Sequence, residues 1–190
     1  MRHARPHRIE LVEGVADPGL DEVGVDQANR LAGWLADEPS VHAVYTSPLR
    51  RARETAVPIV DTLGLTLRVD DGVSEWDADA SSYIPVEELK ADAHPAWEAM
   101  RDERWDDLGV DAVGFVRRVV GAVDAIAAAH AGERVAVVCH AGVVNAYTAA
   151  VLGLERLLWF EPMYTSITRV LVNRDGRRSV FTLNEHAHLR

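Results

Sequence analysis

The sequence predicts an α/β fold with a mainly parallel sheet flanked by helices on both faces. Residues 135–139 form a continuously apolar run, which is typical of a strand buried on both faces of a parallel sheet. Short segments with strand composition alternate with longer segments of helical periodicity, which favours the same fold class. A chain of 190 residues buries about 70% of its unfolded surface. We therefore expect one domain over residues 1–190 that needs no disulfide or metal to fold.

The first part of the chain predicts two helices with a strand between them. Apolar residues recur at helical spacing over residues 24–36, and residues 41–46 have the composition of a short strand. The Ser-Pro pair at 47–48 ends that strand. Because proline suits the first turn of a helix, we expect a second helix to begin there, to bend at Pro58 and to end at Gly64.

The last part of the chain predicts two helices, a buried strand and a hairpin. The longest periodic helix covers residues 111–130, and the strand at 135–139 leads into a helix that ends near Gly153. Two further strands, 168–172 and 179–183, flank an Asn-Arg-Asp-Gly turn. This arrangement indicates a β-hairpin.

Residues 70–111 differ in composition from the rest. They contain 14 Asp or Glu and three Lys or Arg, together with Trp76, Tyr83, Trp97 and Trp105. We interpret this segment as an acidic cap insertion over one end of the sheet. Charge runs of this kind usually form a solvated outer surface. A purely solvating role for these acidic residues therefore stays open as an alternative.

Composition excludes several classes of protein. The net charge of −10 argues against a nucleic-acid partner, which would need a basic face. No apolar stretch approaches the roughly 20 residues that a membrane helix requires, so we expect no membrane partner. The first residues lack the apolar core of a signal peptide. The single cysteine excludes an intrachain disulfide and fits a reducing, cytoplasmic location. The oligomeric state is left open.

Candidate functional residues follow two of the predicted strands. Ligands of open α/β sheets bind at the carboxyl ends of the strands. The strand at 135–139 is followed by His140 and a helix N-terminus, which favours anions. The strand at 41–46 is followed by a helix whose first turns contain Arg50, Arg51 and Arg53. A histidine and an arginine cluster at neighbouring strand ends indicate a phosphate site.

Several motifs resemble those of the histidine phosphatase superfamily, also called phosphoglycerate-mutase-like. The most specific is Ser-Pro-Leu-Arg-Arg-Ala-Arg-Glu-Thr-Ala at 47–56, which is similar to the family's Ser-x-Leu-x-Arg-Ala-x-x-Thr-Ala signature. Arg2-His3-Ala4 resembles its Arg-His-Gly motif, with alanine for glycine, and residues 137–142 resemble its second histidine motif. Residues 164–168 and 184–189 resemble its C-terminal landmarks. The resemblance implies a three-layer phosphoglycerate-mutase-like sandwich.

The resemblance also implies site residues. His3 would be the nucleophile that becomes phosphorylated, with Arg2, Arg51 and His140 around the phosphoryl group. We expect a protonated His140 and the arginines to stabilise the transferring group. No metal or other cofactor is then required. Glu75 is the candidate general acid, because neighbouring acidic residues should raise the pKa of one carboxyl group.

The assignment of the general acid leaves two alternatives open. The family's glycine-containing continuation after the glutamate is absent, and the sequence reads Glu-Trp-Asp-Ala-Asp at 75–79. Asp77 is therefore the runner-up for the general acid. A solvated acidic loop is the simpler alternative for both carboxylates.

These residues favour a metal-independent phosphomonoesterase that hydrolyses a small phosphorylated metabolite through a phosphohistidine. The alternatives are a phosphoglycerate mutase and a catalytically weak binding module on the same fold. If the acidic segment overhangs the pocket, the leaving group of the substrate should not be strongly anionic. The aromatic residues of that segment would then favour an apolar leaving group.

Other features receive simpler interpretations. Cys139 should be buried core, because successive strand residues point to opposite faces. His186 and His188 could bind a metal, but a surface strand or tail is the simpler interpretation. Trp97 and Trp105 should pack within the cap. Only two residues precede His3, which is too few for the strand that the family has before its nucleophile. We therefore expect that the sequence has a truncated start, that the sheet has a gap beside residues 135–139 and that His3 is loosely held. Another segment in the place of that strand is the alternative.

Overall fold

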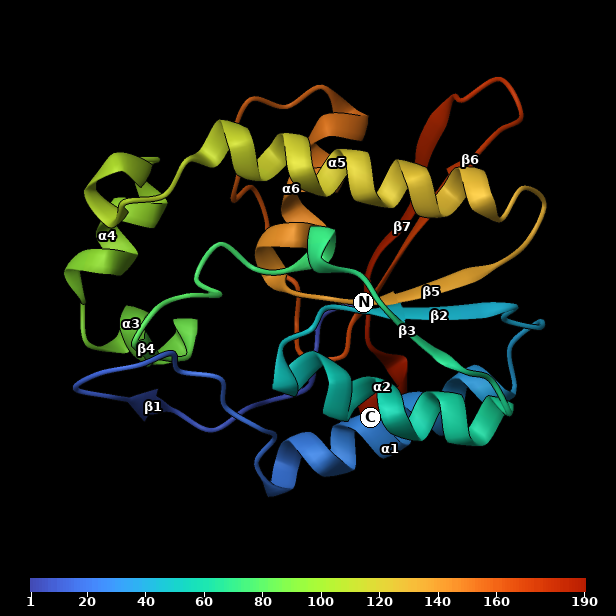
Figure 1. The fold of residues 1–190 in the computed structure, drawn as a ribbon, viewed down its shortest axis with the longest axis horizontal. Coiled ribbons are helices and arrows are strands. Elements are labelled where there is room, and N and C mark those ends of the chain that lie inside the picture. The colour runs from blue at the N-terminus through green and yellow to red at the C-terminus, as the bar shows by residue number, and fades with distance from the viewer.

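The computed structural model describes residues 1–190 and has three layers (Figure 1). The central parallel sheet has the strand order β3 (Leu67–Val69), β2 (Ala43–Thr46), β5 (Val135–Val138). Helices α1 (Glu22–Ala36) and α2 (Arg50–Leu63) cover one face of this sheet. Helices α5 (Ala112–Ala129) and α6 (Ala141–Leu152) cover the other. The predicted α/β fold with helices on both faces is therefore confirmed.

The helix ends follow from local chemistry. Asp21 caps α1 by accepting from the backbone N–H of Gly24 at 2.7 Å, and Asp111 caps α5 in the same way. Helix α2 ends at Gly64, whose φ of 65° lies in the left-handed region that glycine adopts without strain. Helix α2 begins at Arg50, two residues later than Pro48, because Leu49 still has extended backbone and serves as the N-cap.

The core consists of two apolar clusters, one on each face of the sheet. Strand β5 contributes to both, since Ala136 and Val138 belong to the cluster under α1 and α2. Val137 and Cys139 belong to the cluster under α5 and α6. This alternation explains the uninterrupted apolar run, and it confirms that Cys139 is a buried core residue, with 4% of its surface exposed.

The first three residues occupy the position next to β5. The backbone N–H of His3 donates to the Cys139 carbonyl at 2.8 Å, and the Cys139 N–H donates to the Met1 carbonyl at 2.8 Å. On the other side, the Arg2 N–H donates to the Ser166 carbonyl at 3.2 Å. Pairing with β5 reaches back to Val137, whose carbonyl accepts from the Met1 amino group. The expectation of a loosely held His3 is wrong, because the strand-like pairing fixes its backbone from both sides.

The chain ends in the predicted hairpin. Strands β6 (Ile167–Val172) and β7 (Arg178–Glu185) pair antiparallel, and a short 3₁₀ turn (Ala187–Leu189) then packs against α1. This turn brings His188 back toward the centre of the molecule. No helix combines the length and the apolar character needed to cross a membrane.

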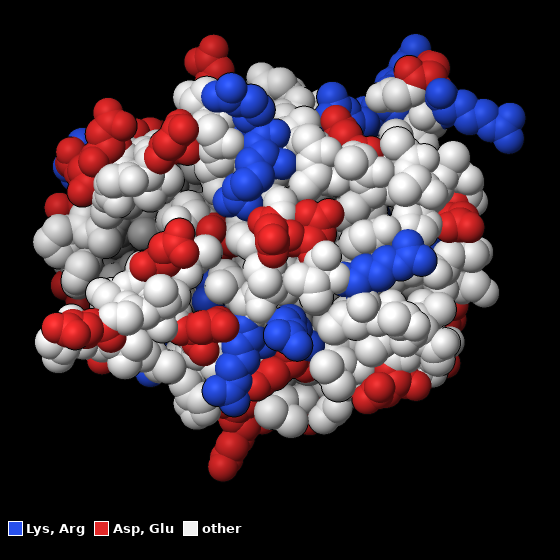
Figure 2. Space-filling view, in the orientation of Figure 1, with Lys and Arg blue, Asp and Glu red and all other residues white.

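Residues 70–111 form short elements beyond the carboxyl ends of β2 and β5, at the left of Figure 1. They include β4 (Ser82–Tyr83), which pairs with β1 (Ile9–Glu10). Two short helices follow, α3 (Val86–Ala91) and α4 (Pro95–Arg101). Most acidic side chains of this segment lie on its outer surface, and Figure 2 shows them along that side of the molecule.

Candidate active site

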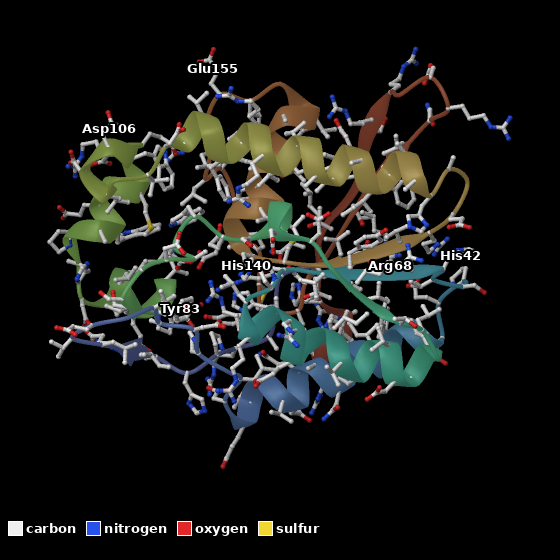
Figure 3. The ribbon with its side chains drawn as sticks, in the orientation of Figure 1. His42, Arg68, Tyr83, Asp106, His140 and Glu155 are labelled. Atoms are coloured by element: carbon white, nitrogen blue, oxygen red, sulfur yellow. The ribbon has the colours of Figure 1, made fainter.

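The structure brings all five predicted site residues together at the carboxyl ends of the strands. They come from four segments: the paired N-terminal residues, which contribute two of them, the first turn of α2, the loop after β3, and the end of β5. All five are buried, with exposed fractions of 0–6%; they are Arg2, His3, Arg51, Glu75 and His140. The rings of His3 and His140 lie 5.1 Å apart, and Figure 3 shows His140 at the centre of the molecule.

His3 is held as a neutral imidazole with one free ring nitrogen. Its Nδ1 lies 2.7 Å from the Ala4 carbonyl, and since a carbonyl can only accept, Nδ1 donates and Nε2 has the lone pair. Burial and the neighbouring Arg51 and Arg2 guanidinium groups hold the pKa of His3 well below its usual range. A neutral imidazole of this kind is a nucleophile across physiological pH.

Two buried arginines lie close to the histidine pair. The Arg51 guanidinium faces the Tyr83 ring at 4.5 Å and bonds Asp77 Oδ1 through Nη2 at 3.1 Å. The Arg2 guanidinium lies 3.7 Å from the Tyr164 ring centroid, and its Nη1 donates to the Pro162 carbonyl. Both arginines have a buried Nε without a hydrogen-bond partner. Such buried donors are rare in proteins, and an anion would satisfy them.

The other two arginines of α2 point elsewhere. Arg50 and Arg53 are exposed, and Arg50 pairs with Glu54 on the same helix. Arg51 is 1% exposed. Residues one or two positions apart on a helix do not share a face. Of the three arginines, only Arg51 therefore points into the site.

His140 lies in surroundings that disfavour its protonated form. Ser47 Oγ lies 2.8 Å from His140 Nε2, whereas Nδ1 is buried and has no partner. Burial, followed by Arg51 and His3, holds the pKa of His140 well below its usual range. These surroundings favour the neutral imidazole, opposite to the protonated form expected from the sequence, and leave the arginines as the fixed positive charges.

Glu75 is a buried carboxyl group with an elevated pKa. Its Oε2 accepts from the Gly142 N–H at 2.8 Å, at the N-terminus of α6, and its Oε1 accepts from the Trp76 N–H at 3.2 Å. Burial is the main cause that raises the pKa of Glu75 to about 8, and the Asp77 carboxylate contributes. The expected direction is correct, although burial has the larger effect.

Asp77 lies in the same site with a different partner. Burial raises its pKa, and the contact with Arg51 opposes this effect. The two carboxyl groups therefore have distinct environments, because Glu75 meets backbone N–H groups and Asp77 meets a guanidinium.

Several residues with no role in the sequence interpretation help to build the site. Ser47 contacts His140, and Thr55 accepts from the Ala4 N–H at 2.9 Å. Thr165 donates from its N–H to the His3 carbonyl at 3.3 Å. Ser47 and Thr55 fall within the signature at 47–56, so that motif contained the signal for both.

The remaining candidates lie outside the site. His186 Nδ1 contacts the Asn184 carbonyl, and His188 Nε2 contacts the Thr165 hydroxyl. No group of three or more His, Cys, Asp or Glu side chains is arranged to hold a metal ion. Trp105 packs edge-on against Trp76, and Lys90 lies over the Trp97 ring.

Comparison with known proteins agrees with this geometry. The profile of the histidine phosphatase superfamily (branch 1) matches residues 1–185. The bifunctional protein Rv2228c of Mycobacterium tuberculosis is 34% identical over 146 residues, which cover 74% of this chain and 40% of that longer protein. The chain thus spans less than half of that relative. Phosphoserine phosphatase 1 of Hydrogenobacter thermophilus is 27% identical and covers 100% of this chain and 92% of its own length.

A solved structure has the same fold over nearly the whole chain. The mycobacterial glucosyl-3-phosphoglycerate phosphatase, in complex with VO3, superposes with a TM-score of 0.76 at 25% identity. The match covers 97% of each chain. With its profile match, its fold and its paired histidines and arginines, the chain belongs to the histidine phosphatase superfamily, branch 1.

Proposed function

We propose that this protein is a metal-independent phosphomonoesterase that transfers the phosphoryl group of a small metabolite to His3 and then to water. One observation carries the proposal: His3 has a free Nε2 in a buried site that also contains two arginines and a carboxyl group whose pKa is raised to about 8. Nucleophile, charge stabilisation and proton donor are thus within one buried site, which phosphoryl transfer requires.

In the first step, His3 Nε2 attacks phosphorus and forms a P–N bond while the ester P–O bond breaks. The leaving oxygen takes the proton of Glu75, so the alcohol departs neutral and Glu75 becomes a carboxylate. The Gly142 N–H, 2.8 Å from Oε2, stabilises that carboxylate at the N-terminus of α6.

In the second step, water attacks phosphorus and the P–N bond breaks. Glu75 takes a proton from the attacking water, which restores the acid for the next cycle. The His3 Nε2 lone pair is restored, and inorganic phosphate is released.

The arginines supply the fixed positive charge for both steps. The unpartnered Nε groups of Arg2 and Arg51 can donate to phosphoryl oxygens, whose charge increases in the transition state. His140 contributes as a neutral donor. If the Ser47 hydroxyl donates to Nε2, the hydrogen of His140 is on Nδ1, the nitrogen without a protein partner.

The substrate is proposed only as a class. The phosphoserine phosphatase and glucosyl-3-phosphoglycerate phosphatase relatives act on small phosphorylated molecules by their names. The Tyr83 and Tyr164 rings lie 6.5 Å and 5.8 Å from the His3 ring. We propose that these rings border the position of a small leaving group.

A colorimetric assay with p-nitrophenyl phosphate tests the proposal. We expect hydrolysis that a chelator does not reduce and that Glu75→Gln slows strongly. Absence of hydrolysis in the wild type, with the fold intact by circular dichroism, would favour a binding module. A mutase would instead convert 3-phosphoglycerate only when primed with a bisphosphorylated glycerate.

A further inference from the structure

Asp77 occupies a position between the phosphate-binding arginine and solvent. Its Oδ1 lies 3.1 Å from Arg51 Nη2, and 27% of its side chain is exposed against 1% for Arg51. A leaving group attached to a phosphate on Arg51 would therefore lie within reach of this carboxylate. The charge of Asp77 acts on the leaving group at short range, where water screens it less than at an open surface.

Apart from Arg51, the cations on this side of the site have other partners. Arg118 of α5 donates to the backbone carbonyls of Asp71, Gly72 and Ser74. From β1 and its approach, Arg8 is already paired with Glu10 and Glu88. From α3, Lys90 is paired with Glu161. Arg51 is paired with Asp77 at 3.1 Å, and a bound phosphoryl group would share Arg51 and leave part of the Asp77 charge uncompensated. Burial lowers the pKa values of the His3 and His140 imidazoles, which favours their neutral forms.

A second carboxylate lies on the same side of the site. Glu87 of α3 accepts from the Tyr164 hydroxyl at 3.4 Å, and the Tyr164 ring is 5.8 Å from that of His3. No ion pair involves Glu87, but its side chain is exposed, so water screens its charge more than that of Asp77. The third carboxyl group, Glu75, has its pKa raised by burial and by Asp77, and faces the α6 N-terminus.

We propose that Asp77 selects substrates by the charge of the leaving group, so that the enzyme prefers phosphate esters of amino alcohols to phosphate esters of hydroxy acids. This inference rests on the proposed phosphomonoesterase activity and adds a substrate class to it. An ammonium group close to the ester oxygen would be attracted by Asp77 and Glu87. A carboxylate or second phosphate in the same place would meet repulsion from both.

Three small substrates separate charge from size. O-phosphoethanolamine has an ammonium group, 2-phosphoglycolate has a carboxylate, and ethyl phosphate has neither. The quantity to measure is kcat/KM for each, in wild type, Asp77→Asn and Asp79→Asn. Asp79→Asn is the matched control, because Asp79 is an exposed residue of the same loop with no contact to Arg51.

In the wild type we expect phosphoethanolamine to exceed phosphoglycolate in kcat/KM. We expect Asp77→Asn to reduce the ratio of the two by about tenfold, which is modest for unit charges a few ångströms apart at a protein surface. Asp79→Asn should leave the ratio unchanged. Asp77→Asn should also lower the inhibition constant of inorganic phosphate, because it removes the anion that competes for Arg51.

An unchanged ratio in folded Asp77→Asn, or a wild type that prefers phosphoglycolate, would overturn the proposal. If Asp77→Asn does not fold, Glu87→Gln is the variant that tests the inference. We expect it to decrease the ratio by a smaller factor, and an unchanged ratio would contradict the inference. Hydrolysis of p-nitrophenyl phosphate by the wild type reports on the proposed function separately. If that substrate is hydrolysed and the charge preference is absent, only the charge-selection proposal fails.

Discussion

Glu75 and Gly142 are joined by a 2.8 Å hydrogen bond from the Gly142 backbone N–H to Oε2 of the carboxyl group. The approach is so close that a Cβ at position 142 would lie 1.8 Å from Cζ3 of Trp76 and 2.3 Å from Oε1 of Glu75. Only glycine fits there without displacing the side chains. The N-terminus of α6 and the carboxyl group of Glu75 therefore form one unit.

We predict that Gly142→Ala decreases kcat by about 10²-fold or more, since a general acid contributes about 10²–10⁴ and the new methyl group displaces Glu75. Its control is Gly121→Ala in α5, where an added Cβ meets nothing within 4 Å. That variant should keep full activity and gain about 0.5–1 kcal/mol of stability. Steady-state kinetics and urea unfolding check both variants. Wild-type kcat in Gly142→Ala would contradict the placement of the acid.

The pH dependence of kcat/KM should have its alkaline limb near pH 8. Burial raises the pKa of Glu75 to about 8, and a general acid is active only while protonated, so activity is lost as pH rises through that value. The acid limb should lie below pH 6.5, because burial lowers the pKa of His3 and the nucleophile stays neutral. The measurement uses ethyl phosphate, whose alkoxide leaving group needs a proton, from pH 4 to 10. In Glu75→Gln the residual rate should show no alkaline limb near pH 8. If the limb were unchanged in this variant, a group other than Glu75 would be responsible for it.

Arg51→Ala should decrease kcat/KM by about 10³-fold, within the range for arginines that stabilise phosphoryl transfer. Arg50→Ala and Arg53→Ala are matched controls from the same helix, and both side chains are exposed. We expect each to retain activity within about twofold. Equal losses at the three positions would show that the electrostatic field of the helix, and not contact with the phosphoryl group, is responsible.

The sheet, its helices and the hairpin were predictable because their signals are local. The apolar run at 135–139, the periodicity of α5 and the turn before β7 each require only a few adjacent residues. The placement of residues 1–3 was not predictable in this way. Their pairing with Cys139 and Ser166 depends on segments more than 130 residues away.

The candidate residues of the site were predictable from motif positions, but their protonation states were not. Burial determines the pKa values of His140 and Glu75, and the sequence does not show how deeply either group is enclosed. The role of Ser47 beside His140 was missed for a related reason, since the contact joins two strand ends that are distant in the chain.

His188 should matter through Thr165. Its Nε2 lies 3.1 Å from the Thr165 hydroxyl, and Thr165 has a φ of 55°, in the left-handed region that a β-branched residue rarely adopts. His188→Ala should decrease the free energy of unfolding by about 1–3 kcal/mol, and kcat should fall because the Thr165 N–H contacts the His3 carbonyl. His186→Ala is the control, with smaller effects expected. Urea denaturation measures the free energy of unfolding of each variant, and steady-state kinetics measures kcat. Equal stability of His188→Ala and wild type would contradict this role of His188.

The central claim is that His3 carries the phosphoryl group between substrate and water. The measurement is rapid quenching of the enzyme with ³²P-labelled aryl phosphate, followed by peptide mapping under alkaline conditions, where phosphohistidine survives. We predict acid-labile label on the N-terminal peptide at His3, no label and no turnover in His3→Ala, and more label in Glu75→Gln if water attack is slowed more than transfer. Label on His140, or turnover of His3→Ala at the wild-type rate, would contradict the account.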